Sequence, residues 1–350
     1  MTETLNGKAQ PPPRFVSARD VAELAGVSRS AVSRAFTPGA SVAPETREKI
    51  MEAATRLGYQ VNDLARGLLA NRSRIVGLVA TKPEVGFRAH LTAALAAVLI
   101  RRGSVPVLIN AGETTEETEA AQRTLFGHRA EAVIVLSGSP PSSFIELARS
   151  NGLPLVAIGR EAPEIDLVQT DNAAAARALA AAFIRAGHRR LAFAGSESGT
   201  PAIVEREQAF VAEARRLGAD VAVARGPDTD YAGGLLAAKR LFSTDERPSA
   251  VFAVNDLVAF ALIDHVKTRL GLRVPEDVAV VGFDDLPEAA WLGYRLSTFR
   301  QGPLDLAERA VALLENRAAD PSAPPVSLRI EARLMIRDTF RPVTDGASLP

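Results

Sequence analysis

Two arginines and three serines lie within a few residues of one another near the start of the chain: Ser28, Arg29, Ser30, Ser33 and Arg34. Guanidinium and hydroxyl groups donate hydrogen bonds to phosphate oxygens and base edges, and a major-groove arginine can bind the O6 and N7 atoms of guanine together. The spacing puts these residues on the first turns of one short helix. The segment therefore indicates DNA binding, and the alternative is a set of ordinary solvated side chains.

Three further polar side chains, which follow apolar runs or a loop in the larger part of the chain, indicate a ligand-binding site. Asp284 and Asn255 each come directly after an apolar run, and Arg206 follows a glycine- and serine-containing loop at 195–199. Open α/β sheets bind ligands at the carboxyl ends of their strands, so we expect these side chains to meet at one ligand. Together they supply the donors and acceptors that a polyol needs. The alternative is that Asp284 and Asn255 cap the helices that follow them.

Signatures of catalysis and of cofactor binding are missing from the sequence. It contains no Gly-Lys-Ser/Thr phosphate loop and no Gly-x-Gly-x-x-Gly motif, and Glu197 stands where a nucleophile elbow has serine. Cysteine is absent and the four histidines are scattered, so no metal-spaced set of ligands is formed. We therefore predict no catalytic residues, no cofactor and no metal site.

The N-terminal polar residues must be positioned by short helices. Ser17 and Asp20 form a capping box ahead of an apolar helical pattern that ends at Gly26. Ser28 caps a second helix that runs to about Phe36, and a third helix starts at Pro44, ends at Leu57 and is followed by Gly58. Two helices joined by a glycine-containing turn, with a third behind them, predict a helix-turn-helix.

The rest of the chain alternates between apolar runs and alanine- and arginine-rich helical stretches. Such alternation predicts a parallel sheet covered on both faces, and the number of runs favours two similar subdomains over one large sheet. The runs that we read as strands are 75–80, 105–109, 132–136, 155–158, 191–194, 219–223, 250–254 and 278–281.

Charge is unevenly distributed although the totals balance, with 41 basic and 41 acidic residues. Residues 14–74 hold ten lysines and arginines against six aspartates and glutamates, which suits a segment that binds phosphate, although it is also within ordinary scatter. Residues 1–13 are polar and proline-rich and contain no apolar run, so we expect neither a secretory leader nor a membrane span. A cysteine-free chain of this kind is expected in the cytoplasm, on the nucleoid.

Several stretches carry a resemblance that extends over residues 15–340. In the N-terminal part they are DVAELAGVS at 20–28, AVSR at 31–34, PETR at 44–47, LGY at 57–59 and NDLARGL at 62–68. In the larger part they are AGHRRLAF at 186–193, ND at 255–256 and VVGFDD at 280–285. In these stretches the chain resembles the LacI family of bacterial transcription repressors.

The resemblance implies an α/β chain with a small all-α head, a hinge helix and two doubly wound parallel-sheet subdomains of the periplasmic-binding-protein type. We expect a disordered tail at 1–14, the helix-turn-helix domain at 15–60 and the hinge helix with its linker at 61–74. The effector-binding and dimerisation domain is expected at 75–340, followed by a tail at 341–350. Within it the N-subdomain would take 75–171 and 302–327, and the C-subdomain 172–299 and 328–340.

The resemblance also adds DNA-binding residues to those found above, namely Ser17 together with Asn62, Arg66 and Leu68 of the hinge. In the family a leucine from each hinge enters the minor groove and kinks the duplex, and Leu68 matches it; the alternative is that Leu68 packs on the domain beneath. Such a wedge costs unstacking energy but bends DNA onto more protein. A hinge segment of about nine residues is too short to be a stable helix alone, which favours ordering on DNA.

The family's ligand contacts match Arg206, Asn255 and Asp284, and the resemblance adds Tyr231 as an aromatic that stacks on the effector and Phe87 at the lip. Two departures stand out. Ala43 replaces the usual capping serine of the third helix, and residues 81–87 replace the usual asparagine-proline-aromatic lip. These substitutions weaken one helix start and leave the effector contacts of the lip open.

The expected function is that of a ligand-controlled repressor that binds palindromic operator DNA as a homodimer and takes a sugar or sugar derivative as effector. Two alternatives are a periplasmic sugar-binding protein, which has the same body, and a sugar-active enzyme. The DNA-binding head and the lack of a leader count against the first, and the missing catalytic constellation counts against the second. The residues after Arg337 include two prolines and a glycine and hold a single leucine, so we expect no tetramer-forming coiled coil.

Overall fold

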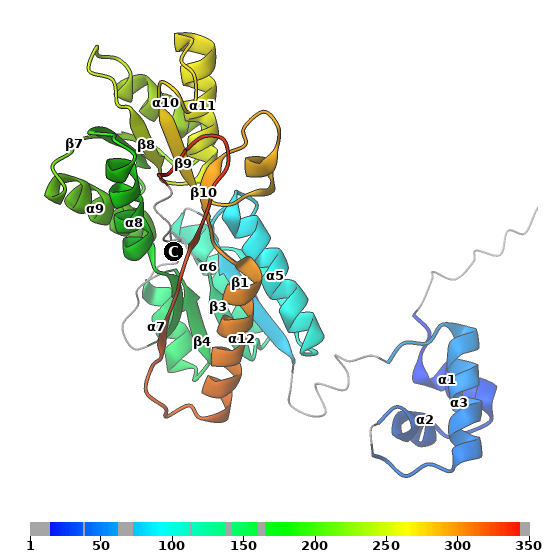
Figure 1. Cartoon of the computed structure of the whole chain (residues 1–350). Coiled ribbons are helices and arrows are strands. Elements are labelled where there is room, and N and C mark those ends of the chain that lie inside the picture. Colours follow the sequence, from blue (N-terminus) through cyan, green and yellow to red (C-terminus); the bar gives the residue numbers. More distant parts are fainter. Residues whose placement is uncertain are drawn as a thin grey trace, which may run out of the picture. The chain divides into compact units, whose positions relative to one another are not determined.

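The computed structural model describes residues 15–37, 39–61, 73–112, 114–136, 142–159 and 165–343. The chain divides into two compact units, Met1–Arg72 and Ser73–Pro350 (Figure 1). Within the described residues, the first unit is made of helices and the second holds the strands.

The first unit contains the three predicted helices, α1 (Ala18–Ala25), α2 (Arg29–Ala35) and α3 (Pro44–Leu57). The capping box at the start of α1 is confirmed, because the Asp20 carboxylate accepts from the Ser17 backbone N–H at 2.8 Å and Ser17 Oγ accepts from the Asp20 N–H at 3.4 Å. Gly26 ends α1 with a φ of 66°, a left-handed conformation that glycine adopts without strain. As expected, Ala43 gives α3 no side-chain cap.

Small and branched side chains form the core of this unit and let the helices approach closely. Phe36 and Tyr59 close one side of this core with ring centroids 5.5 Å apart. Arg47 donates to the carbonyl oxygens of Ala35 and Ala40, and these bonds tie the loop between α2 and α3 to α3. The side chains buried in this core are Val21, Ala22, Val32, Ala35, Ile50, Ala53 and Ala54.

The second unit contains two six-stranded sheets in its described residues. The first sheet, which we call the N-subdomain sheet, has the order β11-β5-β4-β3-β1-β2 and is parallel throughout. Its strands are β1 (Ile75–Ala80), β2 (Val105–Asn110), β3 (Ala132–Val135), β4 (Leu155–Ile158), β5 (Asp166–Thr170) and β11 (Ser327–Ile330). The helices of the same subdomain are α5 (Phe87–Arg101), α6 (Thr115–Gly127), α7 (Ser142–Ser150) and α12 (Pro303–Ala319).

The second sheet, which we call the C-subdomain sheet, has the order β12-β10-β9-β8-β6-β7. Its strands run parallel except for β12, which pairs antiparallel with β10 at the edge. They are β6 (Arg190–Ser196), β7 (Asp220–Gly226), β8 (Ala250–Ala253), β9 (Ala279–Asp284), β10 (Ser297–Arg300) and β12 (Arg333–Met335). The helices are α8 (Asn172–Arg185), α9 (Pro201–Arg216), α10 (Tyr231–Leu241), α11 (Asp256–Leu270) and the 3-10 helix η1 (Pro287–Ala290).

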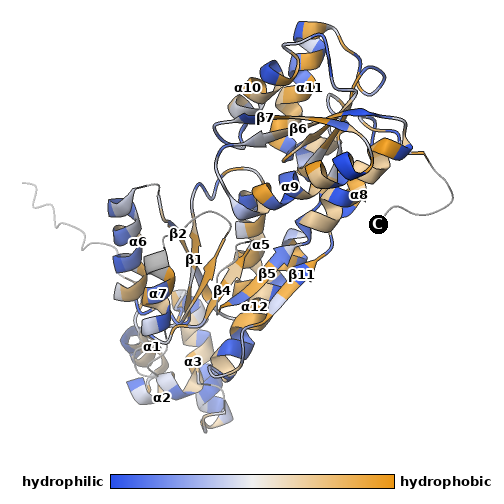
Figure 2. Cartoon of the chain, turned by 90° about the vertical axis from the view of Figure 1, so that its left-hand side faces the viewer, coloured by the Kyte–Doolittle hydropathy of each residue, from blue (hydrophilic) through white to orange (hydrophobic). Residues whose placement is uncertain are grey.

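The central strands β1 and β4 are hydrophobic along their length, and helices cover the faces of the sheets (Figure 2). All four residues of β3 and of β8 are buried, as expected of central strands in a covered parallel sheet. In the C-subdomain a cluster of phenylalanines fills the core, with Phe252 packed against Phe193 and Phe210 at centroid separations of 5.3 Å. This packing gives rigid sheets whose carboxyl edges can hold a site.

The chain passes between the two subdomains three times. The first crossover is Asp171 between β5 and α8, the second is 301–302 between β10 and α12, and the third is 331–332 between β11 and β12. The third corrects the expected boundary after residue 327. Ser327–Ile330 pairs with β5, so this segment belongs to the N-subdomain. Among the described residues no helix is long and apolar enough to cross a membrane.

Candidate functional site

The polar residues of the helix-turn-helix lie together on α2 and at its start. Ser28, Arg29, Ser30, Ser33 and Arg34 are all exposed. Ser28 Oγ accepts from the Ala31 N–H at 3.2 Å and lies 2.9 Å from Ser30 Oγ, so Ser28 has the capping role that the sequence predicts. Within the described part of the chain, the guanidinium groups of Arg29 and Arg34 have no hydrogen-bond or ion-pair partner. Both remain available to an external acceptor.

Four of the predicted DNA contacts are not residues of α2 or its cap. Ser17 caps α1, and its hydroxyl donates to the Asp20 carboxylate at 2.7 Å, so its side chain already has an intramolecular partner. Asn62, Arg66 and Leu68 lie outside the described residues. The hinge assignment therefore remains a prediction.

A cavity of about 130 Å³ lies between the two subdomains of the second unit. The N-subdomain contributes the start of α5, the C-subdomain contributes the carboxyl ends of its strands and the loops after them, and the second crossover contributes Gln301. Four of the five predicted effector residues line this cavity: Phe87, Arg206, Asn255 and Asp284.

Arg206 lies in the cavity wall, where only 6% of the residue is exposed and hydrogen bonds hold its guanidinium in place. Its Nε donates to Asn172 Oδ1 and its Nη1 to the Val254 carbonyl oxygen, both at 2.7 Å. The guanidinium carbon lies 3.5 Å from the centre of the Phe283 ring, which adds a cation–π contact. Burial lowers the pKa of Arg206 to about 10, so the side chain is a cation at neutral pH. Its remaining Nη2 has no partner in the described structure.

Asp284 supplies a buried carboxylate at the end of β9. Gln301 Nε2 donates to Asp284 Oδ1 at 2.6 Å. Burial raises the pKa of Asp284 to about 6, and the nearby Arg206 cation and the bond from Gln301 oppose this rise. The side chain caps no helix, since η1 begins after Leu286 without a side-chain cap. The capping alternative for Asp284 is therefore wrong, and its carboxylate can accept from a ligand.

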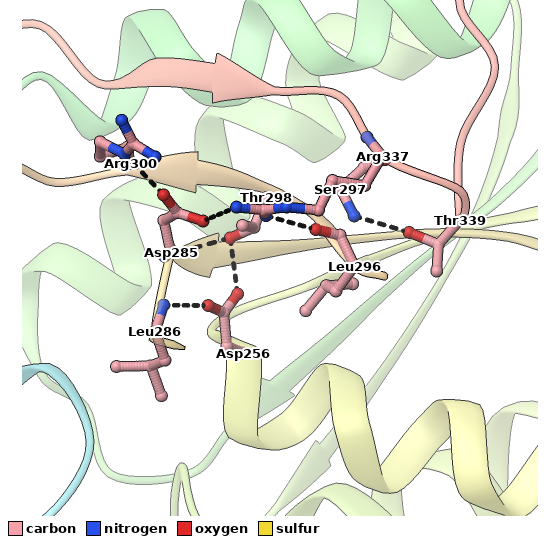
Figure 3. Close-up of polar contacts among 9 residues, drawn as sticks. All are labelled: Asp256, Asp285, Leu286, Leu296, Ser297, Thr298, Arg300, Arg337 and Thr339. Carbon is pink, nitrogen blue, oxygen red and sulfur yellow. Dashed lines mark hydrogen bonds and ion pairs between the residues drawn. The ribbon is translucent and has the colours of Figure 1, made fainter. Parts of the chain in front are cut away.

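A buried polar network fixes the unusual backbone that carries Asp284. Asp284 and Asp285 both have positive φ, 122° and 56°, which non-glycine residues rarely adopt. Asp285 is held in place by Arg300 Nε and Arg337 Nη2, each at 2.6 Å (Figure 3).

Beside it, the Asp256 carboxylate accepts from Thr298 Oγ1 at 2.5 Å and from the Leu286 N–H at 2.8 Å (Figure 3). Burial raises the pKa of Asp256, and the neighbouring Asp284 charge raises it further. These bonds compensate the backbone strain of the turn after β9 and so position Asp284.

Asn255 and Phe87 line the cavity but also have structural roles. Asn255 caps α11, with Oδ1 accepting from the Val258 N–H at 3.0 Å and Nδ2 donating to the Thr229 carbonyl oxygen at 2.9 Å. The capping alternative thus holds for Asn255, whose amide positions the Thr229 loop. Phe87 is the first residue of α5, and its half-buried ring packs against the core of the N-subdomain.

Tyr231, the fifth predicted effector residue, is not among those that line the cavity, and its contact with the effector stays a prediction. Its hydroxyl donates to Asp264 Oδ2 at 2.7 Å, and 40% of the residue is exposed. Tyr294 donates to the same oxygen at 3.1 Å. The bond to Asp264 raises the pKa of Tyr231 to about 12.

Several cavity residues were not predicted from the sequence. Gln301 joins Asp284 to the other subdomain, since Thr170 Oγ1 donates to its Oε1 at 2.7 Å. Lys82 and Asp228 form an ion pair of 2.9 Å between the lip after β1 and the loop after β7, and so link the two subdomains directly. Asp228 lies two residues after the end of β7 at Gly226, and a polar residue soon after a strand is a signal that the sequence contained.

Comparisons with known proteins agree with this architecture. Residues 17–62 match the family model described as bacterial regulatory proteins, lacI family, and residues 180–340 match that of a periplasmic binding protein-like domain. The HTH-type transcriptional regulator CelR of Thermobifida fusca is 33% identical over 331 residues, covering 91% of this chain and 96% of that protein. The HTH-type transcriptional repressor PurR of Vibrio cholerae is 28% identical over 336 residues, covering 93% and 98%.

Solved structures show the same arrangement. A transcriptional regulator CelR–cellobiose complex superimposes with a TM-score of 0.70 at 29% identity, covering 93% of this chain and all of that one. The lac repressor dimer bound to operator and the anti-inducer ONPF gives a TM-score of 0.83 at 22% identity, covering 93% and 99%, which shows a shared fold. The chain therefore belongs to the lacI family of bacterial regulatory proteins and is a DNA-binding transcriptional regulator with an effector-binding domain.

Proposed function

We propose that this protein is a repressor whose affinity for operator DNA is controlled by a small effector, a sugar or sugar derivative, bound between the two subdomains. One observation carries the proposal: the cavity takes residues from both subdomains and from the crossover at Gln301. A ligand there contacts both bodies at their junction, so it favours the subdomain arrangement that it fits better. The cellobiose in the CelR complex supports a sugar as the class of effector.

The exposed side chains of α2 are proposed to read the operator. Arg34 is assigned to a guanine and Arg29 and Ser30 to neighbouring positions, because the start of a recognition helix faces the base edges. Ser17, Ser28 and Ser33 are assigned to the same surface. Asn62, Arg66 and Leu68 keep their proposed roles in the hinge. With operator DNA as partner, the protein would work on the nucleoid.

The working assembly is proposed to be a homodimer, because one helix-turn-helix contacts one half-site and a two-fold dimer presents two heads to a palindrome. Exposed apolar side chains support an interface on the second unit. Leu292 is 93% exposed and Trp291 is 58% exposed in the segment after η1, and Val105 and Leu108 on β2 are about half exposed. Trp291 and Leu292 are adjacent in the chain, and contiguous exposed apolar groups mark interaction sites more often than scattered ones do.

The role of the cavity is proposed to be binding without turnover. Arg206 Nε and Nη1, the Asn255 amide and the Gln301 amide are engaged in hydrogen bonds within the protein, and the Gln301 bond orients Asp284. The relatives named above are regulators, which supports the same assignment. Incubating the protein with its ligand and following the ligand by NMR tests this point, since turnover would favour the enzyme alternative.

The decisive experiment joins the two halves of the proposal. Operator sequences are first selected from random DNA with the full-length chain, and fluorescence anisotropy then measures operator affinity with and without a panel of sugars and sugar derivatives. We expect one palindromic consensus and a ligand that changes operator affinity by at least about tenfold, equivalent to 1.4 kcal/mol of coupling. A chain that binds sugar but selects no DNA sequence would instead be a binding protein of the periplasmic type.

A further inference from the structure

Arg88 is a cavity residue whose chemistry the proposed function leaves without a role. It lies on the first turn of α5 and lines the cavity. Its Nη1 donates to the Thr81 carbonyl oxygen at 2.6 Å, which fixes the plane of the guanidinium. In the described part of the chain its other N–H groups have no partner. Burial lowers the pKa of Arg88, so the cation is held in a site that partly withholds water from it.

The carboxylates near Arg88 do not pair with it. Asp228 is bound by Lys82 Nζ at 2.9 Å and by the Thr229 N–H at 2.7 Å. Asp284 is bound by Gln301, and Arg206 is the cation that acts most strongly on its pKa. Glu84 is exposed at the protein surface. These carboxylates attract Arg88 from a distance, but none lies within ion-pair range of its guanidinium.

A second guanidinium with a free nitrogen, that of Arg206, lines the same small cavity. In addition, α5 begins at the cavity wall at Gly86 without a side-chain cap, so the positive end of its dipole lies there. A planar guanidinium with adjacent free N–H groups matches a carboxylate or a phosphate, which accept two parallel hydrogen bonds. A neutral hydroxyl offers a single uncharged acceptor atom, so it does not reproduce this paired, charge-assisted geometry.

We propose that the effector carries an oxyanion, a carboxylate or a phosphate, and that Arg88 binds it, while Asp284 and Arg206 bind the hydroxyl-bearing part of the ligand. The inference rests on the proposed function and specifies its ligand as an acidic sugar derivative. It assigns the altered lip at 81–87 a purpose, because this lip supplies both the carbonyl of Thr81 that orients Arg88 and the ion pair that keeps Asp228 away from it.

The test uses the full-length chain and matched sets of ligands: glucose with gluconate, glucuronate and glucose 6-phosphate, and the corresponding galactose set. Calorimetry should find the tightest ligand among the acids, with its uncharged parent sugar weaker by about 30-fold or more. The R88Q variant should weaken the acid by about 10- to 100-fold and change the parent sugar by less than about threefold, and R88K should fall between wild type and R88Q.

The matched control is R101Q, at the other end of the same helix. The Arg101 side chain is 57% exposed and pairs with Glu308 at 3.5 Å. It should keep wild-type affinity for every ligand, and unfolding curves of both variants confirm that they fold. A parent sugar that binds as tightly as its acid, an R88Q variant with wild-type acid affinity, or no binding by any acid overturns the inference. Comparison of the carboxylates with the phosphate identifies the source of the oxyanion.

Operator binding separates this inference from the proposed function. A neutral sugar that releases or strengthens operator binding equally in wild type and R88Q refutes the oxyanion while leaving an effector-controlled repressor. If an acid ligand binds through Arg88 but leaves operator affinity unchanged, the proposed control of DNA binding is refuted, while the assignment of an oxyanion to Arg88 still holds.

Discussion

Gln301 connects the charge state of Asp284 to the stability of the crossover, and the variant Q301M tests this connection. Methionine has a similar length but cannot form the bonds of 2.6 Å to Asp284 Oδ1 and of 2.7 Å from Thr170 Oγ1. Gln301 is 8% exposed and Thr170 is 5% exposed, so water does not readily replace either bond. A hydrogen bond to a charged group is worth about 1.5–3 kcal/mol and one between neutral groups about 0.5–1.5 kcal/mol.

The cost of Q301M should depend on pH because Asp284 titrates. The pKa of Asp284 is about 6 in the folded protein against an ordinary value of 3.8. Its contribution to stability is therefore fully present below about pH 4 and is lost as the pH rises to about 6. Removing the Gln301 donor should raise the pKa of Asp284 in the folded protein to roughly 7. Above that pH, the variant should therefore lose about 1.4 kcal/mol more of its free energy of unfolding than it loses at low pH.

Urea unfolding at pH 5 and pH 8 measures the effect. We expect Q301M to lower the free energy of unfolding by about 3 kcal/mol at pH 8 and by about 1.5 kcal/mol at pH 5, where Asp284 is largely protonated. The matched control is T170V, which removes the bond to Gln301 Oε1 and leaves the carboxylate bond intact. It should cost about 1 kcal/mol at both pH values. Equal losses for Q301M at pH 5 and pH 8 would refute the coupling between Gln301 and the Asp284 charge.

Four further predictions concern DNA and ligand binding. R34A should weaken binding to the selected operator by about 1–3 kcal/mol and relax specificity at one base pair, and uniform weakening on all sequences would make Arg34 a phosphate contact. L68A should reduce the DNA bend angle measured by FRET and leave effector affinity unchanged. R206A should lose about 2–5 kcal/mol of effector affinity and keep operator binding. If calorimetry finds that R206A binds the effector as tightly as wild type, the effector does not bind at Arg206. L292D should give light-scattering masses near one chain, 37.1 kDa, where wild type gives about twice that mass.

The sequence predicted the strands that are apolar on both faces and missed those that are not. Each of the eight predicted runs overlaps one of the strands β1 to β4 and β6 to β9. The missed strand β10 contains Ser297 and Thr298, which are fully buried because Thr339 and Asp256 bond to them. Such burial depends on partners more than forty residues away, which local periodicity does not reveal. The edge strand β11 alternates between exposed and half-buried residues and contains a polar Arg329.

The same limit explains which site residues were found. Arg206 and Asp284 were predicted because polar residues after buried strands meet at one sheet edge. Gln301 follows β10, and it was missed because that strand was missed. Tyr231 was assigned to the ligand by resemblance alone, and its partner Asp264 lies on another helix. Arg88 directly follows the lip at 81–87, where the resemblance fails, so neither kind of reasoning applied to it.

Hydrogen bonds through the crossovers join Arg206 and Asp284, the two buried residues that we propose bind the effector. Arg206 binds Asn172, whose Nδ2 donates to the Thr170 carbonyl oxygen at 3.1 Å. Thr170 binds Gln301, which binds Asp284. Thr170 and Asn172 flank the first crossover, and Gln301 is part of the second. Under the proposed function, a ligand that contacts both Arg206 and Asp284 acts at once on two of the three backbone segments that join the subdomains. A ligand held only by the lip contacts neither end of this series of bonds, so we expect it to occupy the cavity without changing operator affinity.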